Sequence, residues 1–304
     1  MVIAVDATPL AMSSGGIRRY TEELTRALAS NQPDDALHLI SDQPSCGSPR
    51  FPGNVSMQCW ERRGIDRRWW TVGAGRAAKH LRCQVFHGTN FSVPYLPLCP
   101  SILTLHDLSP WRDPAWHHDA RRVRRRTPLL LRLRVPTVII TPTEAVRTEA
   151  SERFLIPPDR IFTTPYAPHL QRSQPYAHPD PYFLSVATLE PRKNLPSVIE
   201  AWRILRMRYR VDLLVAGRRR DDAPNLKPEP GLVILGEVDE KSLASLYSGA
   251  VGCVYPSLYE GFGLPPLEAM NCGCPTIVSN DPALREVSAG ASLHVEARDV
   301  RALA

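Results

Sequence analysis

Residues 255–275 read YPSLYEGFGLPPLEAMNCGCP, and the local pattern of this stretch decides the fold class of the chain. The apolar run 251–255 leads into it, and a short apolar run bounded by Gly and Pro is typical of a buried parallel strand. The turn 260–263 separates this strand from a helix that Pro265 and Pro266 open, because proline fits the first helical turn. In α/β sheets, a strand, a glycine turn and a helix N-terminus present backbone N–H groups to an anionic ligand.

Two carboxylates lie within this stretch, Glu260 on the turn and Glu268 early in the helix. A carboxylate repels phosphate, so both residues are candidates to accept hydrogen bonds from the hydroxyl groups of a sugar or a ribose. The alternative is structural, because the helix dipole alone favours acidic residues near a helix N-terminus. The residues themselves leave both interpretations open.

Residues 260–270, EGFGLPPLEAM, resemble the EX7E motif of retaining glycosyltransferases of the GT-B fold, in particular the large family 4 group. Glu260 and Glu268 have the spacing of that motif. Segments 86–90 and 105–108 resemble the mannosyltransferase members of the group. The segments that carry the resemblance follow one another in the expected order: 6–20, which contains the glycine loop GGIRRY; 86–90, FHGTN; 105–108, LHDL; and 185–194, SVATLEPRKN.

The resemblance implies an α/β fold of the GT-B class, with two Rossmann-like domains that contain doubly wound parallel sheets and face a cleft. The alternation of apolar runs and helical patterns independently predicts doubly wound parallel sheets. The predicted strands are 2–7, 37–41, 55–60, 85–88, 102–107 and 137–141 in the first half, and 182–188, 211–216, 232–235, 251–255, 276–279 and 292–295 in the second. A helical pattern is predicted at 66–82.

The length of 304 residues accommodates two domains of ordinary size. We expect an acceptor-side domain at 1–168 and a nucleotide-sugar-binding domain at 182–304. The segment 165–181 is rich in proline and polar residues, so residues 169–181 are expected to form the linker. Asn194 is expected to N-cap a helix in the second domain. GT-B members usually continue with C-terminal helices, so we expect the second domain to be truncated.

The formal net charge of +6 favours anionic partners, which include nucleotide-sugars, anionic lipids and nucleic acids. No recognised nucleic-acid motif accompanies the charge, so we expect no nucleic-acid partner. No apolar stretch approaches the roughly 20 residues of a transmembrane helix, and the N-terminus lacks a basic region, which predicts a cytoplasmic protein. Seven cysteines without a Cys-x-x-Cys pair argue against a zinc site or a disulfide framework, so Cys272 and Cys274 are expected to be packing residues.

The most basic run is 121–134, RRVRRRTPLLLRLR. Arginines interleaved with leucines predict a segment that contacts an anionic membrane surface, which would suit a lipid-linked acceptor and a peripheral location on the inner face of the membrane. The other interpretation is a helix that packs its leucines on the sheet and exposes its arginines to water. Pro128 is expected to break or kink any helix in this run.

The resemblance also implies the roles of individual side chains in transfer from a nucleotide-sugar. Arg192 and Lys193 would neutralise the diphosphate, where cations stabilise the departing charge more in the transition state than in the ground state. Glu268 would bind the ribose and Glu260 the donor sugar. His106 would hydrogen-bond the donor sugar, although a histidine at a strand end is more often structural when judged from position alone.

Backbone groups complete the expected donor site. Gly15 and Gly16 have no Cβ, so their backbone can approach a phosphate closely, and the resemblance assigns the diphosphate to them. It assigns further backbone contacts with the sugar or phosphate to Gly261, Phe262, Gly263 and Leu264. His87 also follows the family pattern, but its position supports a functional role less well.

Retention of anomeric configuration is implied by the family. A double displacement would need a positioned carboxylate nucleophile, and the sequence identifies none, so we favour front-face substitution in which the donor phosphate deprotonates the acceptor. We expect no metal requirement, because Arg192 and Lys193 can replace the cation and no Asp-x-Asp motif is present.

The expected activity is transfer of a hexose, with mannose from GDP-mannose as the first choice, to a saccharide or lipid-linked acceptor in polysaccharide or glycolipid biosynthesis. UDP-glucose or UDP-GlcNAc as donor stays open. So does a non-catalytic module that binds nucleotide-sugars.

Overall fold

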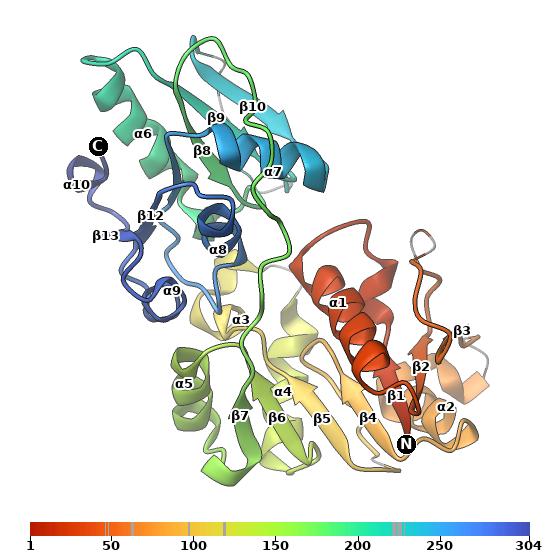
Figure 1. Ribbon diagram of the computed structural model, residues 1–304. Coiled ribbons are helices and arrows are strands. Elements are labelled where there is room, and N and C mark those ends of the chain that lie inside the picture. Colours follow the sequence, from red (N-terminus) through yellow and green to blue (C-terminus); the bar gives the residue numbers. More distant parts are fainter. Residues whose placement is uncertain are drawn as a thin grey trace. The chain divides into compact units, whose positions relative to one another are not determined.

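The computed structural model describes the whole chain except residues 46, 48, 62, 63, 97, 118, 119, 221, 222, 224–226 and 228. The described residues form two compact α/β units (Figure 1). Unit 1 contains Met1–Trp111, His118–Pro142 and Val146–Thr164, and unit 2 contains Arg112–His117, Thr143–Ala145 and Pro165–Ala304. The domain and linker boundaries expected from the sequence stay predictions.

Unit 1 contains a seven-stranded sheet in the order β3-β2-β1-β4-β5-β6-β7, and its neighbouring strands are parallel. The chain builds outward from β1 in one direction and then, from β4 onward, in the other. A doubly wound sheet of this order has its topological switch point between β1 and β4. The strands are β1 (Val2–Asp6), β2 (Ala36–Ser41), β3 (Val55–Cys59), β4 (Val85–Gly88), β5 (Ser101–Thr104), β6 (Val138–Thr141) and β7 (Ile161–Thr163).

Helices and short helical turns connect these strands. The helical pattern predicted at 66–82 is divided in the structure into the 3-10 turn η2 (Gly64–Arg67), the π-helical turn η3 (Trp69–Gly73) and the short helix α2 (Ala74–His80). The other helices that begin or end in unit 1 are α1 (Gly16–Asn31), α3 (Ser109–Arg112), α4 (Arg121–Arg132) and α5 (Glu144–Phe154), with the 3-10 turns η1 (Thr8–Ala11) and η6 (Pro158–Arg160).

Helix α4 continues through Pro128, so the break that was one of the two expected effects does not occur. Proline has no N–H to donate to the carbonyl of Arg124, one turn earlier. The indole Nε1 of Trp111 donates to that carbonyl instead, at 3.1 Å. The side chain of Trp111 therefore satisfies the acceptor that the proline would leave without its usual helical partner.

Unit 2 contains a six-stranded sheet with the order β10-β9-β8-β11-β12-β13, again with parallel neighbours. All six strands correspond to predicted ones, and the switch point lies between β8 and β11. The strands are β8 (Tyr182–Val186), β9 (Asp212–Ala216), β10 (Leu232–Gly236), β11 (Gly252–Tyr255), β12 (Thr276–Ser279) and β13 (Leu293–Val295).

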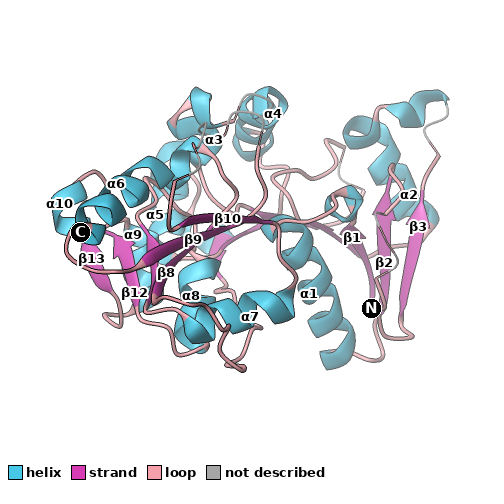
Figure 2. Ribbon diagram, turned by 90° about the horizontal axis from the view of Figure 1, so that it is seen from above, coloured by secondary structure: helices cyan, strands magenta, loops and turns pink. Residues whose placement is uncertain are grey.

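Helices cover both faces of the sheet of unit 2. Figure 2 shows α6 and α10 on one face and α7 and α8 on the other. Parallel strands covered on both faces are buried on both sides, which explains why their sequences are nearly continuous apolar runs. The helical elements are η7 (Pro191–Lys193), α6 (Leu195–Arg206), α7 (Glu240–Gly249), α8 (Leu264–Asn271), α9 (Pro282–Ser288) and α10 (Val300–Leu303).

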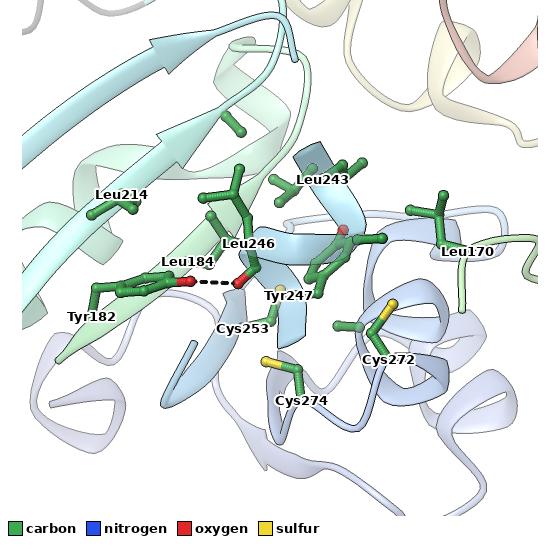
Figure 3. Packing of buried hydrophobic residues seen from close by; sticks show 14 residues of the cluster. Leu170, Tyr182, Leu184, Leu214, Leu243, Leu246, Tyr247, Cys253, Cys272 and Cys274 are labelled. Carbon is green, nitrogen blue, oxygen red and sulfur yellow. Dashed lines mark hydrogen bonds between the residues drawn. The ribbon is translucent and has the colours of Figure 1, made fainter. Parts of the chain in front are cut away.

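The core beneath α7 and α8 contains three buried cysteines, Cys253, Cys272 and Cys274, among leucines and tyrosines (Figure 3). All three thiols are free, which confirms the packing role expected for Cys272 and Cys274. Tyr182 is buried on β8, and its hydroxyl donates to the carbonyl of Leu246 at 2.8 Å (Figure 3). This bond satisfies a polar group that would otherwise be costly inside an apolar core.

None of the described helices is long and apolar enough to cross a membrane.

Candidate active site

The loops after β8 and β11 lie side by side at the switch point of unit 2. The loop after β8 leads into η7 and contains Arg192 and Lys193. The loop after β11 contains Glu260 and leads into α8. Doubly wound sheets bind ligands outside the carboxyl ends of the strands at such a point. The structure therefore brings two of the segments singled out in the sequence into one site.

Lys193 and Glu260 form the centre of this site. Lys193 Nζ lies 2.5 Å from Glu260 Oε1 and 2.6 Å from the hydroxyl of Tyr255. The hydroxyls of Tyr255 and Ser257 both donate to the same carboxylate oxygen. Burial opposes ionisation of Glu260, but the charges of Lys193 and Arg192 outweigh it and lower the pKa of Glu260 to about 2. Glu260 is therefore a fully ionised, weakly basic carboxylate at neutral pH.

Arg192, in the loop after β8, connects this loop to the loop after β11. Its Nη2 lies 2.8 Å from Glu190 Oε1, its Nη1 donates to the carbonyl of Tyr259 at 2.7 Å, and Nη1 is 3.3 Å from Glu260 Oε2. Arg220 Nη1 lies 2.5 Å from the second oxygen of Glu190. Burial opposes ionisation of Glu190, but the nearby cations, Arg192 first, lower its pKa. We call Glu190, Arg192, Lys193, Arg220 and Glu260 the switch-point charge cluster.

The switch-point charge cluster contains three cations and two carboxylates. It therefore has an excess of one positive charge while each carboxylate keeps a cationic partner. Burial, followed by repulsion from Arg192, lowers the pKa of Lys193 even though Glu260 raises it. An additional anion would reduce the repulsion between the neighbouring cations, so the electrostatics of the cluster favour a phosphate ligand.

The turn before α8 depends on glycine. Gly263 has a φ of 95° and is the N-cap of α8, where a Cβ would lie 2.3 Å from Leu284 Cδ2. As a glycine, Gly263 has no side chain with which to cap this N-terminus. The backbone N–H of Glu260 donates to Asp281 Oδ2 at 3.2 Å, and Asp281 also caps α9. The predicted backbone ligands lie in this part of the chain: Gly261, Phe262 and Gly263 in the turn, and Leu264 as the first residue of α8.

Glu268 is buried on α8, beside a histidine that the sequence did not single out. Its Oε1 lies 3.4 Å from Nδ1 of His169, and Nε2 of His169 lies 3.1 Å from Glu240 Oε1. The imidazole thus lies between a buried and an exposed carboxylate. His169 falls in the predicted linker, where no periodic pattern marks any residue as functional, so sequence reasoning had no signal to identify it.

In unit 1, the predicted glycine loop leads into α1. Gly15 has a φ of 121° and is the N-cap of α1, and no side chain caps this helix. A Cβ added to Gly15 or Gly16 would meet no heavy atom of the described residues within 4 Å. The two glycines therefore leave open space beside the helix N-terminus, as a close approach of a ligand to the backbone requires.

His106 follows β5, and its Nε2 is 2.7 Å from the carbonyl of Thr89. A carbonyl can only accept, so Nε2 carries the proton. Burial lowers the pKa of His106, which keeps the ring neutral at pH 7 and leaves the lone pair on Nδ1. The ring packs edge-on against Tyr20, with 4.8 Å between ring centroids. His106 is thus a fixed, neutral imidazole with an acceptor nitrogen.

His87 and Asp6 lie deeper in unit 1. His87 is buried with Nε2 2.9 Å from Thr104 Oγ1, and burial followed by the neighbouring His106 lowers its pKa to about 4, which favours a structural role. Asp6 is fully buried; its Oδ1 accepts from the backbone N–H of Thr8, and burial raises its pKa to about 7. Sequence reasoning assigned no role to Asp6, which ends a strand like many structural residues.

The described residues contain no group of three or more His, Cys, Asp or Glu side chains that could hold a metal ion.

Comparison with known proteins extends over the whole chain. The family model described as glycosyltransferase family 4 matches residues 14–172, and the model described as glycosyl transferases group 1 matches residues 168–304. The O-antigen chain mannosyltransferase B of Escherichia coli is 34% identical over all of this chain and 88% of its own length. The O-antigen chain mannosyltransferase RfbU of Salmonella typhimurium is 28% identical over 73% of this chain and 62% of its own length.

Solved structures show the same architecture. Sucrose-phosphate synthase from Thermosynechococcus elongatus superposes with a TM-score of 0.75 at 18% identity, over 99% of this chain and 87% of that one. WaaG, a glycosyltransferase involved in lipopolysaccharide biosynthesis, gives a TM-score of 0.69 at 13% identity, over 100% of this chain and 89% of that one. At these identities the likeness shows the fold alone. Together with the two family models, it shows that the chain belongs to the group 1, family 4 glycosyltransferases and is an enzyme of the GT-B fold.

Proposed function

We propose that this glycosyltransferase transfers mannose from GDP-mannose to a saccharide or lipid-linked acceptor, with retention of anomeric configuration. The choice of mannose is supported by the relatives whose names describe O-antigen chain mannosyltransferases. The observation that carries the proposed donor site is the buried Lys193–Glu260 pair at the switch point of unit 2. In this proposal unit 2 binds the donor and unit 1 binds the acceptor.

The donor diphosphate binds to the switch-point charge cluster. Lys193 has three N–H donors, so it can retain Glu260 and still bind a phosphate oxygen. Arg192 holds both loops in place and adds positive charge. As the nucleoside diphosphate departs, negative charge develops on its β-phosphate, and these preorganised cations stabilise it without reorganisation.

The carboxylates bind hydroxyl groups of the donor. Glu260 accepts from the sugar, and Glu268 accepts from the ribose. The turn and the uncapped start of α8 supply backbone N–H groups to the sugar or phosphate from Gly261, Phe262, Gly263 and Leu264. The roles of Gly15 and Gly16 toward the diphosphate and of His106 toward the sugar stay proposals for the residues of unit 1.

The reaction follows front-face substitution. Glu260 is a poor candidate for a covalent nucleophile, because its pKa of about 2 makes it weakly nucleophilic and because Lys193, Tyr255 and Ser257 hold its Oε1. In our proposal the bond from C1 of the sugar to the phosphate oxygen breaks as the bond from C1 to the acceptor oxygen forms. The acceptor proton passes to the departing phosphate oxygen. Lys193 and Arg192 supply the cationic charge, so no metal is required.

We also propose that the basic run 121–134 contacts an anionic membrane surface on the cytoplasmic side, where a lipid-linked acceptor would be available. In the structure most of this run is helix α4, and arginines are exposed at both of its ends, Arg121 and Arg122 at the start and Arg132 and Arg134 at the end. Thr127, Leu130 and Leu131 are buried, which is also compatible with the alternative interpretation, a helix that packs its leucines on the sheet.

A donor screen tests this function. Thermal unfolding is measured with GDP-mannose, UDP-glucose, UDP-GlcNAc, GDP and UDP, and the slow release of sugar is followed by NMR. We expect selective stabilisation by GDP and GDP-mannose and release of mannose that first has the α configuration of the donor. Selective stabilisation by the uridine compounds would replace the proposed donor, and initial release of β-mannose would contradict retention.

A further inference from the structure

An open groove of about 480 Å³ lies in unit 1, away from the carboxyl ends of the strands. The C-terminal ends of α4 and α5, the start of β6 and η6 form it. In a parallel sheet these elements meet at the amino ends of the strands, the edge opposite the one that carries His106. The groove is therefore separate from the candidate site residues of unit 1, Gly15, Gly16 and His106. Its charged lining residues are Arg132, Arg134, Arg153 and Arg160, and Leu131 and Phe154 form part of its apolar lining.

The groove is positively charged. Its described lining residues include four arginines and no carboxylate; Glu152 and Asp159 are near in sequence, but both are exposed and neither is among these lining residues. Arginine near a helix C-terminus is also favoured by the helix dipole. That dipole offers roughly half a negative charge per helix, and two helices end here. Four guanidinium charges exceed what the two helix ends balance, so the groove attracts an anion.

Two of the four guanidinium groups are held by carbonyl oxygens. Arg160 donates to the carbonyls of Arg134 and Thr137 as well as to that of Pro136, and Arg153 Nη2 donates to the carbonyl of Trp111 at 3.1 Å. Arg132 and Arg134 are exposed. Arg153 is exposed as well, so three of the four arginines are open to solvent, where planar N–H groups can bind phosphate oxygens in pairs.

Exposed leucines accompany these arginines. Leu129 on α4 is 46% exposed, Leu133 just after α4 is 63% exposed, and Leu155 just after α5 is 85% exposed. Leu129 and Leu133 are four residues apart and so lie on one side of the helix end. Leu155 is also a lining residue of the groove. An apolar group next to a basic groove matches the boundary between lipid headgroups and acyl chains.

The backbone is strained at two positions beside the groove. Leu155 and Arg134 follow the ends of α5 and α4 with φ values of 53° and 54°, in the left-handed region. Glycine or asparagine usually occupies this position after a helix, because a side chain with a Cβ strains the backbone there. Arg82 after α2 and Ala289 after α9 have the same left-handed conformation, so helices of this chain repeatedly end in this way. An asparagine at position 155 would relieve the strain there.

We propose that this groove binds the phosphate headgroup of an anionic phospholipid in a bilayer, while Leu129, Leu133 and Leu155 enter the interfacial region. The arginines bind the phosphate oxygens and the leucines contact the upper acyl chains. This inference deepens the proposed membrane contact by assigning it to the groove and not to the arginine-rich start of α4. It does not depend on the donor, so it is tested without nucleotide-sugar.

The first test is sedimentation of the full chain with phosphatidylcholine vesicles, with and without phosphatidylglycerol. The groove variant is Arg132→Gln with Arg134→Gln. The matched control is Arg121→Gln with Arg122→Gln, which removes the same charge from the start of the same helix. We expect the unaltered chain to bind only the anionic vesicles. The groove variant should bind at least tenfold more weakly, since each arginine at an anionic surface contributes roughly fivefold, and the control less than twofold. Equal losses in the two variants, or no binding by the unaltered chain, would overturn the proposal.

The second test separates lipid binding from folding. Leu155→Asn should raise the unfolding temperature, because asparagine tolerates the left-handed conformation, and should weaken vesicle binding severalfold. Unchanged binding by this variant would exclude insertion of Leu155. Displacement of the protein from vesicles by millimolar glycerol phosphate would instead assign the groove to a soluble phosphate and overturn the bilayer as its ligand.

Discussion

Lys193 and Glu260 are separated by 67 residues in sequence, yet the Nζ of one lies 2.5 Å from the Oε1 of the other in a largely buried site. Such a pair requires both partners, because removal of one leaves a charge with little water to solvate it. Its position at the carboxyl ends of β8 and β11 links the integrity of the switch point to the proposed chemistry. Activity and stability should therefore respond together when either residue changes, and a suitable double variant separates them.

Replacement of Lys193 should disable the enzyme. Lys193→Ala removes a preorganised cation from the proposed diphosphate site and should lower the rate of sugar transfer by at least about 10²-fold. It should also destabilise unit 2, because Glu260 would lose its closest cation. Lys193→Ala with Glu260→Gln should recover much of the unfolding temperature without recovering activity. Lys241→Ala, an exposed lysine on α7, is the control and should leave both quantities unchanged. A folded Lys193→Ala enzyme with a near-normal rate would refute the site.

Glu268 should matter for donor binding. Glu268→Ala should lower transfer by at least about 10²-fold, with most of the loss appearing as a higher KM for the nucleotide-sugar, since a hydroxyl–carboxylate contact to the ribose is present before and during the reaction. His169→Gln should raise the same KM by a smaller factor and leave kcat nearly unchanged, as expected for a residue that positions Glu268. Glu240→Ala removes the exposed carboxylate on the other side of His169 and is the matched control. An effect of Glu240→Ala as large as that of Glu268→Ala would contradict a specific ribose contact.

The stability of the protein should depend on pH through Asp6. Burial raises the pKa of Asp6 from 3.8 to about 7, so the folded state retains its proton over a pH range in which the unfolded state has lost it. Stability from this group is therefore greatest below about pH 4 and falls as the pH rises toward 7, by about 4 kcal/mol for a pKa difference of about 3. The amide of Asp6→Asn can still accept from the N–H of Thr8 and does not ionise.

Unfolding by urea at pH 5 and pH 8 tests the Asp6 prediction. The unaltered chain should lose more stability between these two pH values than Asp6→Asn does. Asp159→Asn, at an exposed aspartate, controls for the general effect of removing a negative charge. Asp281, whose pKa burial raises to about 6, contributes in the same direction in every variant and cancels in the comparison. Parallel pH profiles for the unaltered chain and Asp6→Asn would contradict the prediction.

The indole of Trp111 should stabilise the proline-containing helix. Trp111→Phe removes the donor to the carbonyl of Arg124 and should cost about 1–3 kcal/mol, part of it from the unsatisfied carbonyl. In the Pro128→Ala background the helix supplies its own N–H to that carbonyl, so Trp111→Phe should cost less. The double-mutant cycle in urea gives the coupling directly. Equal costs in the two backgrounds would show that the ring packing of Trp111, and not its hydrogen bond, provides the stability.

The sequence predicts the sheets better than their connections. All six strands of unit 2 were predicted because buried parallel strands are short apolar runs with clear ends. Strand β7 was missed, since only Ile161 of its three residues is buried and it lies at the edge of the sheet. The helix predicted at 66–82 is interrupted by the π-helical turn η3, which tertiary packing decides and a pattern with helical periodicity does not reveal.

In the candidate site, the sequence likewise predicts the motif residues better than their interaction partners. Motif resemblance identified Lys193 and Glu260, and the structure brings them together. It did not identify Asp281 or Glu190, because hydrogen-bond and ion-pair partners are set by the fold and not by spacing. Asn194 lies at the expected N-cap position, but its φ is 56° and its side chain does not cap the helix. Its amide donates instead to the carbonyls of Pro256 and Ala297, contacts that no local pattern could predict.

The strand order of unit 2 has a consequence for synthesis on the ribosome. β8 pairs with β11, and β9, α6, β10 and α7 all emerge before β11 does. At roughly 5–20 residues per second, one edge of β8 waits several seconds for its partner. During that interval Arg192 and Lys193 have not yet met Glu260, and an unpaired strand edge is open to pairing with other nascent chains. Newly made chains should therefore be most vulnerable to aggregation, and most dependent on chaperones, just before the turn that carries Glu260 leaves the exit tunnel.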